Sequence, residues 1–103
     1  MIVDRRTFLV KRGRMNEVIK LLNAEITRIE QQYSNYWKAH RVYTPFVATF
    51  NTLMIEAEWE NLSDYEHFWT AWVGSSEGQA FIVQWGEMLL EHGSTHQLWQ
   101  LVD

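Results

Sequence analysis

Apolar side chains follow two different periods in the first third of the chain. Residues 2 to 11 are rich in β-branched and aromatic types and are bounded by Gly13, which is typical of a strand. From residue 14 to about residue 33, apolar positions instead recur every three or four residues. These positions are Met15, Val18, Ile19, Leu22, Ile26, Ile29 and Tyr33. The pattern predicts a strand followed by an amphipathic helix.

The middle of the chain predicts two more strands. Residues 34 to 39 carry no clean period, so we interpret them as the helix end and a connection in which Tyr36 and Trp37 pack. Residues 40 to 50 look extended, and Pro45, which cannot donate to a sheet ladder, indicates an edge strand or a bulge. Residues 53 to 60 then alternate strictly, which predicts one core face and one wet or paired face. The expected core face carries Leu53, Ile55, Ala57 and Trp59, and the other carries Met54, Glu56, Glu58 and Glu60.

The last third predicts a helix in two pieces and a final strand. Ser63 and Glu66 have the spacing of a capping box, which predicts a helix start near Asp64. Gly74 and the two serines after it interrupt the helix, and Ser76 offers a second cap. The helix resumes to about residue 92, where Gly93 is the expected left-handed stop. Residues 95 to 102 are then expected to form a strand.

The element order β-α-β-β-α-β predicts a ferredoxin-like α+β domain spanning residues 1–103. In that fold a four-stranded antiparallel sheet, with strand order 4-1-3-2, carries two helices on one face. The other sheet face has no cover within the chain, and it would expose Met54. Sheet-to-sheet homodimerisation about a two-fold axis would cover it. Both alternating sets of the first strand mix charged and apolar residues, so the sequence leaves open which set faces the helices.

Composition and charge exclude several classes of protein. Of 103 residues, 47% are hydrophobic, which excludes a disordered chain. The formal net charge of −4 argues against a nucleic-acid partner, and the absence of cysteine excludes disulfides, thiolate metal sites and a cysteine nucleophile. Charges at residues 4 to 6 do not suit a signal peptide, and no apolar run reaches the roughly 18 residues of a membrane span. We therefore expect a cytoplasmic protein without a membrane span.

Aromatic side chains are the main candidates for ligand binding. Trp69 and Trp72, three residues apart, would share a helix face with Tyr65 and Phe68 and could line a cleft between helix and sheet. The alternative is plain core packing, and the two are compatible; Trp85 and Trp99 have the same two interpretations.

The polar residues give weaker evidence for a functional site. The histidines at 40, 67, 92 and 96 lack the spacings typical of metal ligands, and a cluster of His40, Glu56 and His96 would need a favourable strand register, so we expect no metal. Glu56 and Glu58 share one strand face, where they could act as a general base or pair with Arg5 and Arg6 of a neighbouring strand. No nucleophile with its base and no phosphate-binding loop can be identified.

Two segments of the sequence resemble a known family. Asp4, Arg6, Phe8 and Gly13 stand at the positions typical of the opening of NIPSNAP-like proteins, within the dimeric α/β-barrel superfamily. Residues 53 to 69 look like the third strand of that family running into its second helix. The resemblance implies a dimer whose two sheets face each other in a barrel. The haem-degrading members use an Asn on the first strand and a Trp and a His from the second helix region. Here the first strand has no Asn and the helix has no His between Trp72 and His92, so no cofactor is expected.

Three hypotheses about function follow. The first is a homodimeric binding protein that holds a small apolar or aromatic molecule in a helix-sheet cleft. The second is a cofactor-independent monooxygenase or isomerase, of the antibiotic-biosynthesis-monooxygenase type, with Arg6, Tyr43 or Glu56 as its polar group; a wholly apolar cleft wall would exclude it. The third is a structural dimer without a cavity. The candidate ligand-binding residues are Arg6, Phe8, Tyr43, Glu56, Trp69 and Trp72, and the candidate dimer-interface residue is Met54.

Overall fold

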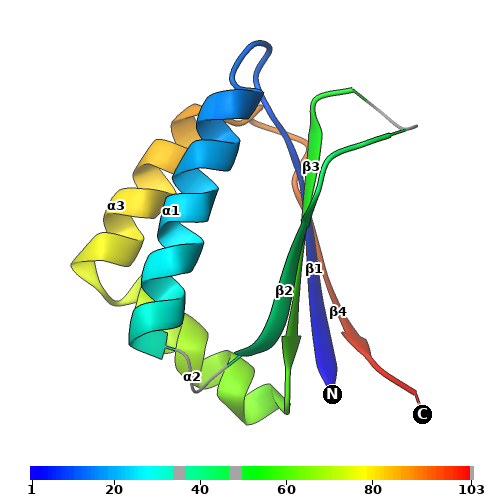
Figure 1. The fold of residues 1–103 in the computed structure, drawn as a ribbon, viewed down its shortest axis with the longest axis vertical. Coiled ribbons are helices and arrows are strands. Elements are labelled where there is room, and N and C mark those ends of the chain that lie inside the picture. The colour runs from blue at the N-terminus through cyan, green and yellow to red at the C-terminus, as the bar shows by residue number, and fades with distance from the viewer. Residues whose placement is uncertain (34–36, 47–49, 103) are drawn as a thin grey trace.

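A single sheet and one layer of helices make up the protein. The computed structural model describes residues 1–33, 37–46 and 50–102. The elements are β1 (Ile2–Leu9), α1 (Met15–Tyr33), β2 (Trp37–Tyr43), β3 (Thr52–Trp59), α2 (Leu62–Val73), α3 (Ser76–Glu87) and β4 (Thr95–Gln100). All three helices lie against the same face of the sheet (Figure 1). The ferredoxin-like α+β fold is therefore confirmed, with the expected second helix divided into α2 and α3.

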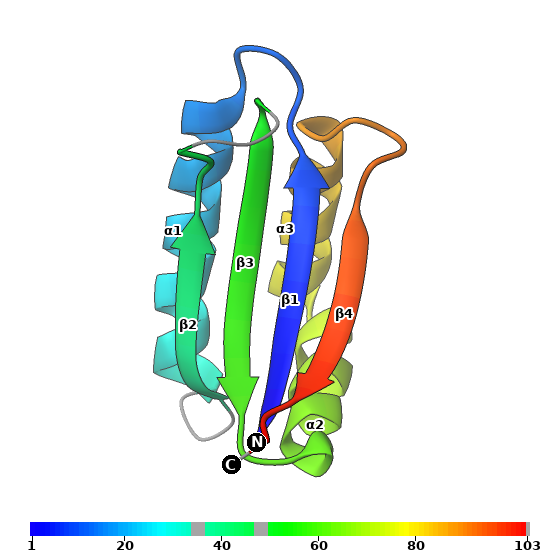
Figure 2. The same ribbon diagram turned by 90° about the vertical axis from the view of Figure 1, so that its right-hand side faces the viewer.

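The sheet is antiparallel, with the order β2-β3-β1-β4, which is the predicted order (Figure 2). β2 is an edge strand, as Pro45 indicated, but the predicted boundaries of 40 to 50 are wrong. It begins at Trp37, shifts register between Trp37 and Ala39, and ends at Tyr43, because Pro45 cannot extend the ladder. Tyr36 and residues 47–49 of the predicted segments lie outside the described residues.

The register shows which side of β1 faces the helices. Asp4, Arg6 and Phe8 pair with Ala57, Ile55 and Leu53 of β3, which form the predicted core face of that strand. The alternate set of β1, including Arg5, pairs with the other face of β3. The charged residues Asp4 and Arg6 are tolerated beneath the helices because they bond to each other.

The core lies between the sheet and the helices. One face of α1 supplies buried side chains in the pattern that the sequence predicted: Val18, Leu22, Ile26 and Ile29. Opposite them, β3 contributes Leu53 and Trp59, which are 0% and 1% exposed. Phe68, Trp72 and Trp85 complete this layer from α2 and α3.

Both caps of the second helical region differ from prediction by one or two residues. Asn61 Oδ1 accepts a hydrogen bond from the backbone N–H of Asp64 at 2.8 Å, so α2 begins at Leu62 and Ser63 is not its N-cap. Ser75 Oγ accepts from the N–H of Gly78 at 3.0 Å and caps α3 in place of Ser76. Asn and Ser are about equally good N-caps, so residue preference alone does not determine which residue caps each helix.

The expected helix stop at Gly93 is wrong. α3 ends at Glu87, and the chain turns back through a bridge between Leu89 and Val10. His92 therefore lies beyond the helix and not in its last turn. Gly93, with φ +153°, lies where a Cβ would be 2.4 Å from Leu9 Cδ1, so close packing explains this glycine.

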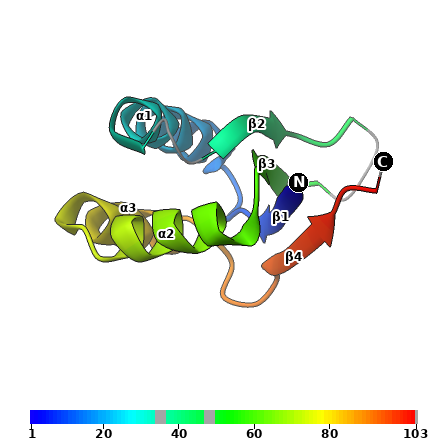
Figure 3. The same cartoon turned by 90° about the horizontal axis from the view of Figure 1, so that it is seen from below.

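β4 is the least covered strand. All six of its residues are exposed, and Trp99 is 53% exposed. Seen along the strands, β4 lies beyond the helical layer (Figure 3). Among the described residues no helix has the length and apolar character needed to cross a membrane.

Candidate functional site

A cavity of about 260 Å³ lies between the helical layer and the sheet. An apolar cavity of about 150 Å³ can hold a benzene molecule, so this one has room for a larger ring system. Its wall carries eight aromatic side chains: Phe8, Trp37, Trp59, Phe68, Trp69, Trp72, Phe81 and Trp85. Its polar lining consists, among the described residues, of Asp4, Arg6, Glu25 and His40. This is the candidate site.

Helical spacing places three of these rings side by side. Phe68 and Trp72 are four residues apart on α2 and stack with centroids 6.0 Å apart, and Trp69 meets Trp72 edge-to-face at 5.3 Å. From α3, Phe81 stacks on Trp85 at 5.2 Å. Since each ring is braced by its neighbours, the wall is formed before any ligand arrives.

Arg6 connects the sheet to α2 at one side of the cavity. Its Nε lies 3.3 Å from both carboxylate oxygens of Asp4, which is 4% exposed. Its guanidinium carbon lies 4.1 Å from the ring centroid of Trp69, a cation–π contact. Arg6 Nη2 also donates to the hydroxyl of Tyr65 at 3.2 Å. These contacts, together with His96 Nε2 at 3.2 Å from Nη2, hold the guanidinium in a fixed position.

His96 and Tyr65 complete a polar cluster with Asp4 and Arg6. His96 Nε2 lies 3.0 Å from Asp4 Oδ1 and 3.3 Å from the Tyr65 hydroxyl. Burial, followed by the charge of Asp4, raises the pKa of Tyr65, so the phenol stays protonated at neutral pH. The same Nε2 also lies 3.2 Å from Arg6 Nη2. Because these contacts of His96 all use one ring nitrogen, the imidazole does not relay a proton between Asp4 and Tyr65 as a catalytic triad would.

Glu25 is the buried acid of α1. Its Oε2 accepts a hydrogen bond from the indole Nε1 of Trp72 at 2.7 Å. Its Oε1 accepts from Arg28 Nε at 2.9 Å, and this bond is the main reason that the pKa of Arg28 is raised. Glu25 is 8% exposed. The ion pair makes the burial of this carboxylate tolerable.

His40 supplies the fourth polar group, from β2. Its Nδ1 lies 3.1 Å from Glu30 Oε1, and its ring stacks on Trp37 at 5.2 Å. His40 and His96 lie on opposite edge strands and both face the helices, whereas Glu56 faces the other way. The suggested cluster of these three residues is therefore not formed, and no group of metal-ligating side chains converges within the described parts of the chain.

The structure divides the six candidate ligand-binding residues between two faces. Arg6, Phe8, Trp69 and Trp72 line the cavity. Tyr43 and Glu56 lie on the open face of the sheet, because Tyr43 pairs with Met54 and Glu56 pairs with Arg5. The alternation of β3 already indicated this face for Glu56, whereas the face of Tyr43 follows only from the register of β2.

Sequence reasoning missed Glu25 as a cavity residue. One signal was available: Glu25 adjoins Ile26 and lies three residues after Leu22, on the apolar face of α1. Asp4 and His40 were not selected either, since a single strand pattern does not show which charged residue faces the core.

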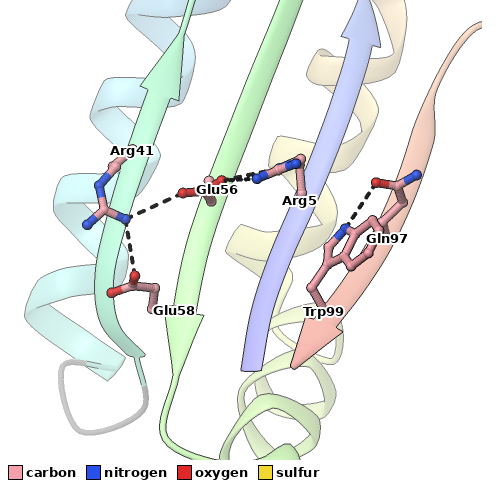
Figure 4. A network of polar contacts seen from close by, with 6 residues as sticks. All are labelled: Arg5, Arg41, Glu56, Glu58, Gln97 and Trp99. Atoms are coloured by element: carbon pink, nitrogen blue, oxygen red, sulfur yellow. Dashed lines mark hydrogen bonds and ion pairs between the residues drawn. The ribbon is translucent and has the colours of Figure 1, made fainter. Parts of the chain in front are cut away.

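The open face carries a network of ion pairs (Figure 4). Glu56 Oε2 accepts from Arg5 Nη2 at 2.9 Å, and Glu56 Oε1 lies 3.5 Å from Arg41 Nη1. Arg41 also reaches Glu58 at 3.4 Å. The expected pairing of these acids with arginines is correct for Arg5, but Arg6 faces the helices and Arg41 takes its place.

Comparison with known proteins shows the fold that this chain shares. No family model and no curated protein matches the sequence. A NIPSNAP family protein from Agrobacterium tumefaciens aligns with a TM-score of 0.80 at 18% identity, over 99% of this chain and 86% of the other. An uncharacterized NIPSNAP domain protein from Burkholderia xenovorans aligns with a TM-score of 0.81 at 20% identity, over 99% and 95%. SnoaB, a cofactor-independent oxygenase from Streptomyces nogalater, gives 0.76 at 12% identity, over 99% and 93%. The chain therefore has the ferredoxin-like fold of NIPSNAP proteins, and the resemblance noted in its sequence is supported.

Proposed function

We propose that this protein binds a small apolar or aromatic molecule in the cavity between its helices and its sheet. The observation that carries the proposal is the cavity of about 260 Å³ with a wall of aromatic rings. Ligand sites are typically concave and mainly apolar, with a few convergent polar groups. Arg6 and Asp4 at one side of this wall supply such groups. The ring-to-ring contacts hold the wall open, so few side chains lose conformational freedom when a ligand binds.

Filling the cavity tests the proposal. Ala57, on the sheet side of the wall, is 6% exposed, and Ala57→Leu places three more carbon atoms there. We expect the affinity for 3-methylindole, measured by isothermal titration calorimetry, to fall at least tenfold. Ala71→Leu, at an exposed position on α2, is the matched control and should bind 3-methylindole like the unmodified protein.

Two results would contradict binding in this cavity. One is no measurable binding of 3-methylindole to the unmodified protein. The other is unchanged affinity in a folded Ala57→Leu variant, with folding checked by circular dichroism.

The second part of the proposal is a homodimer in which the open faces of two sheets meet. Tyr43, Met54 and Thr7 lie in one row across that face, and Trp99 lies beside Val3 on another. Arg5, Arg41 and Glu56 lie between these rows, and Glu58 lies in the row of Val3. These two arginines and two glutamates pair with one another, so their charges are balanced before contact. A face with apolar rows and internally paired charges suits a second copy of itself.

Met54→Asp tests the dimer by placing a carboxylate in the row of Tyr43 and Thr7. Native mass spectrometry should give twice 12.3 kDa for the unmodified protein and a monomer or insoluble protein for the variant. Val83→Asp, at a 60% exposed position on α3, should leave the dimer intact. A monomeric unmodified protein, or a Met54→Asp dimer of unchanged stability, would contradict the proposed interface.

Oxygenation is not included in the proposal. The cavity wall is not wholly apolar, so it meets the minimum requirement for that chemistry. However, Arg6 and Asp4 are engaged with each other, and Glu25 is engaged with Arg28. No observation favours a reaction over binding.

A further inference from the structure

The charged side chains of the cavity wall include two carboxylates and one guanidinium. Asp4 and Glu25 are carboxylates that are 4% and 8% exposed, and both line the cavity. Arg6 is the one lining residue with a permanent positive charge among the described residues, since Arg28 pairs with Glu25 from outside the lining. The lining therefore carries two negative charges against one positive charge.

Glu25 has acceptor capacity that its partners do not use. Its Oε2 accepts from Trp72 Nε1 and Arg28 Nη2, whereas its Oε1 accepts only from Arg28 Nε within the described residues. Each oxygen of a carboxylate can accept about two hydrogen bonds. Oε1 is therefore available to a further donor.

The neutral form of His40 adds another acceptor. Its Nδ1 lies 3.1 Å from Glu30 Oε1, so in the neutral imidazole the proton is on Nδ1 and is donated to that carboxylate. Nε2 is then left with a lone pair.

The aromatic wall also suits positive charge. The face of an aromatic ring is the negative part of its quadrupole and attracts cations. The protein already uses this attraction, because the Arg6 guanidinium lies 4.1 Å from the centroid of Trp69. A ligand cation among the remaining rings would be stabilised in the same way, whereas a ligand carboxylate would face two buried carboxylates.

We propose that the cavity prefers aromatic amines: the ring packs among the indoles, and an ammonium or N–H group donates to Glu25. This inference rests on the proposed ligand binding and specifies the class of ligand. It assigns Glu25 as the residue that determines specificity.

The test compares three molecules that share one ring system. Tryptamine carries an ammonium group, indole-3-acetate carries a carboxylate, and 3-methylindole is neutral. At pH 7 and low salt, calorimetry on the unmodified protein should give at least tenfold tighter binding for tryptamine than for indole-3-acetate. Equal or tighter binding of indole-3-acetate would overturn the inference even if 3-methylindole binds, and the proposed ring binding would then stand. Failure of all three to bind would overturn both.

A variant locates the preference at Glu25. Glu25→Gln keeps the side-chain length and an oxygen that can accept from Trp72 Nε1, but it removes the charge. The affinity for tryptamine relative to the affinity for 3-methylindole should fall about tenfold. Glu17→Gln, on the same helix at an exposed ion pair with Arg14, is the control and should behave like the unmodified protein. If folded Glu25→Gln still prefers tryptamine, the assignment of specificity to Glu25 is wrong. If that variant does not fold, the affinities of the unmodified protein for the three molecules still test whether the cavity prefers amines.

Discussion

Glu25 of α1 and Trp72 of α2 are joined by a buried hydrogen bond of 2.7 Å from the indole N–H to the carboxylate. It links two helices that lie on the same face of the sheet and both contribute to the cavity wall. Hydrogen bonds to charged groups contribute about 1.5–3 kcal/mol. The contact therefore fixes both the packing of the helices and the position of one ring of the wall.

Trp72→Phe removes this bond, and Trp69→Phe is its natural comparison. Trp69 is on the same helix, and its buried Nε1 has no hydrogen-bond partner within the described parts of the chain. Both changes remove part of a ring, but only the first removes a hydrogen bond. We expect Trp72→Phe to lower the free energy of unfolding by about 1–2 kcal/mol more than Trp69→Phe, as measured by urea denaturation. Equal losses would mean that the bond contributes nothing to stability.

Arg6→Gln should be strongly destabilising because it removes the cation that neutralises Asp4. Breaking a buried ion pair costs about 3–5 kcal/mol, and the remaining contact of Asp4 with His96 should keep the loss near the lower end. Arg14→Gln breaks an exposed pair with Glu17 and should cost less than about 1 kcal/mol. Thermal unfolding of the two variants checks the difference; similar melting temperatures would contradict the role given to Arg6.

Replacing either of two glycines of α3 by alanine should change the free energy of unfolding, but in opposite directions. A Cβ at Gly78 would lie 2.0 Å from the backbone oxygen of Trp72, which cannot move without distorting α2, so Gly78→Ala should cost more than about 2 kcal/mol. Nothing lies within 4 Å of a Cβ at Gly86, so Gly86→Ala should stabilise the helix by up to about 1 kcal/mol. Chemical denaturation distinguishes the two, and a stable Gly78→Ala variant would show that the turn between α2 and α3 can open.

Because of Tyr65, the free energy of unfolding should depend on pH in the alkaline range. Its pKa is raised in the folded protein, mainly by burial and then by Asp4. Its contribution is therefore complete below the pKa of an unfolded tyrosine, about 10, and is lost as pH rises through the higher folded value. Urea unfolding should show a smaller loss of stability between about pH 9 and pH 11 for Tyr65→Phe than for the unmodified protein. In ultraviolet titration, one of the four tyrosines should ionise late and be missing from the variant.

Local patterns were enough to predict most of the fold. The period of α1 and the alternation of β3 each reflect one buried face, so Val18 and Leu53 could be placed in the core before the structure was known. The break at Gly74 was also visible. The incorrect predictions concern the ends of helices and strands. Asn61 and Ser63 are comparable N-caps, and which of them caps α2 depends on how the chain leaves β3.

The candidate site was harder to predict because it depends on contacts between distant elements. Arg6 could be paired with a glutamate of the next strand or with Asp4 on its own strand, and only the register separates these alternatives. Glu25 acquires its role through Trp72, which lies 47 residues further along the chain. Tyr43 and Glu56 were grouped with the aromatic residues by chemistry. The alternation of β3 places Glu56 on the opposite face, and the register of β2 with β3 places Tyr43 there too.

The central position of β1 determines when this protein can fold. Ile2 pairs with Trp59 on one side and with Gln100 on the other, so the first strand of this sheet to be synthesised meets its last neighbour only when residue 100 has been made. On the ribosome, one edge of β1 stays unpaired until β4 has left the exit tunnel. Contacts between such distant residues also slow folding, because a long loop must close before they form. The completed sheet is therefore formed after translation has passed residue 100, and not progressively during it.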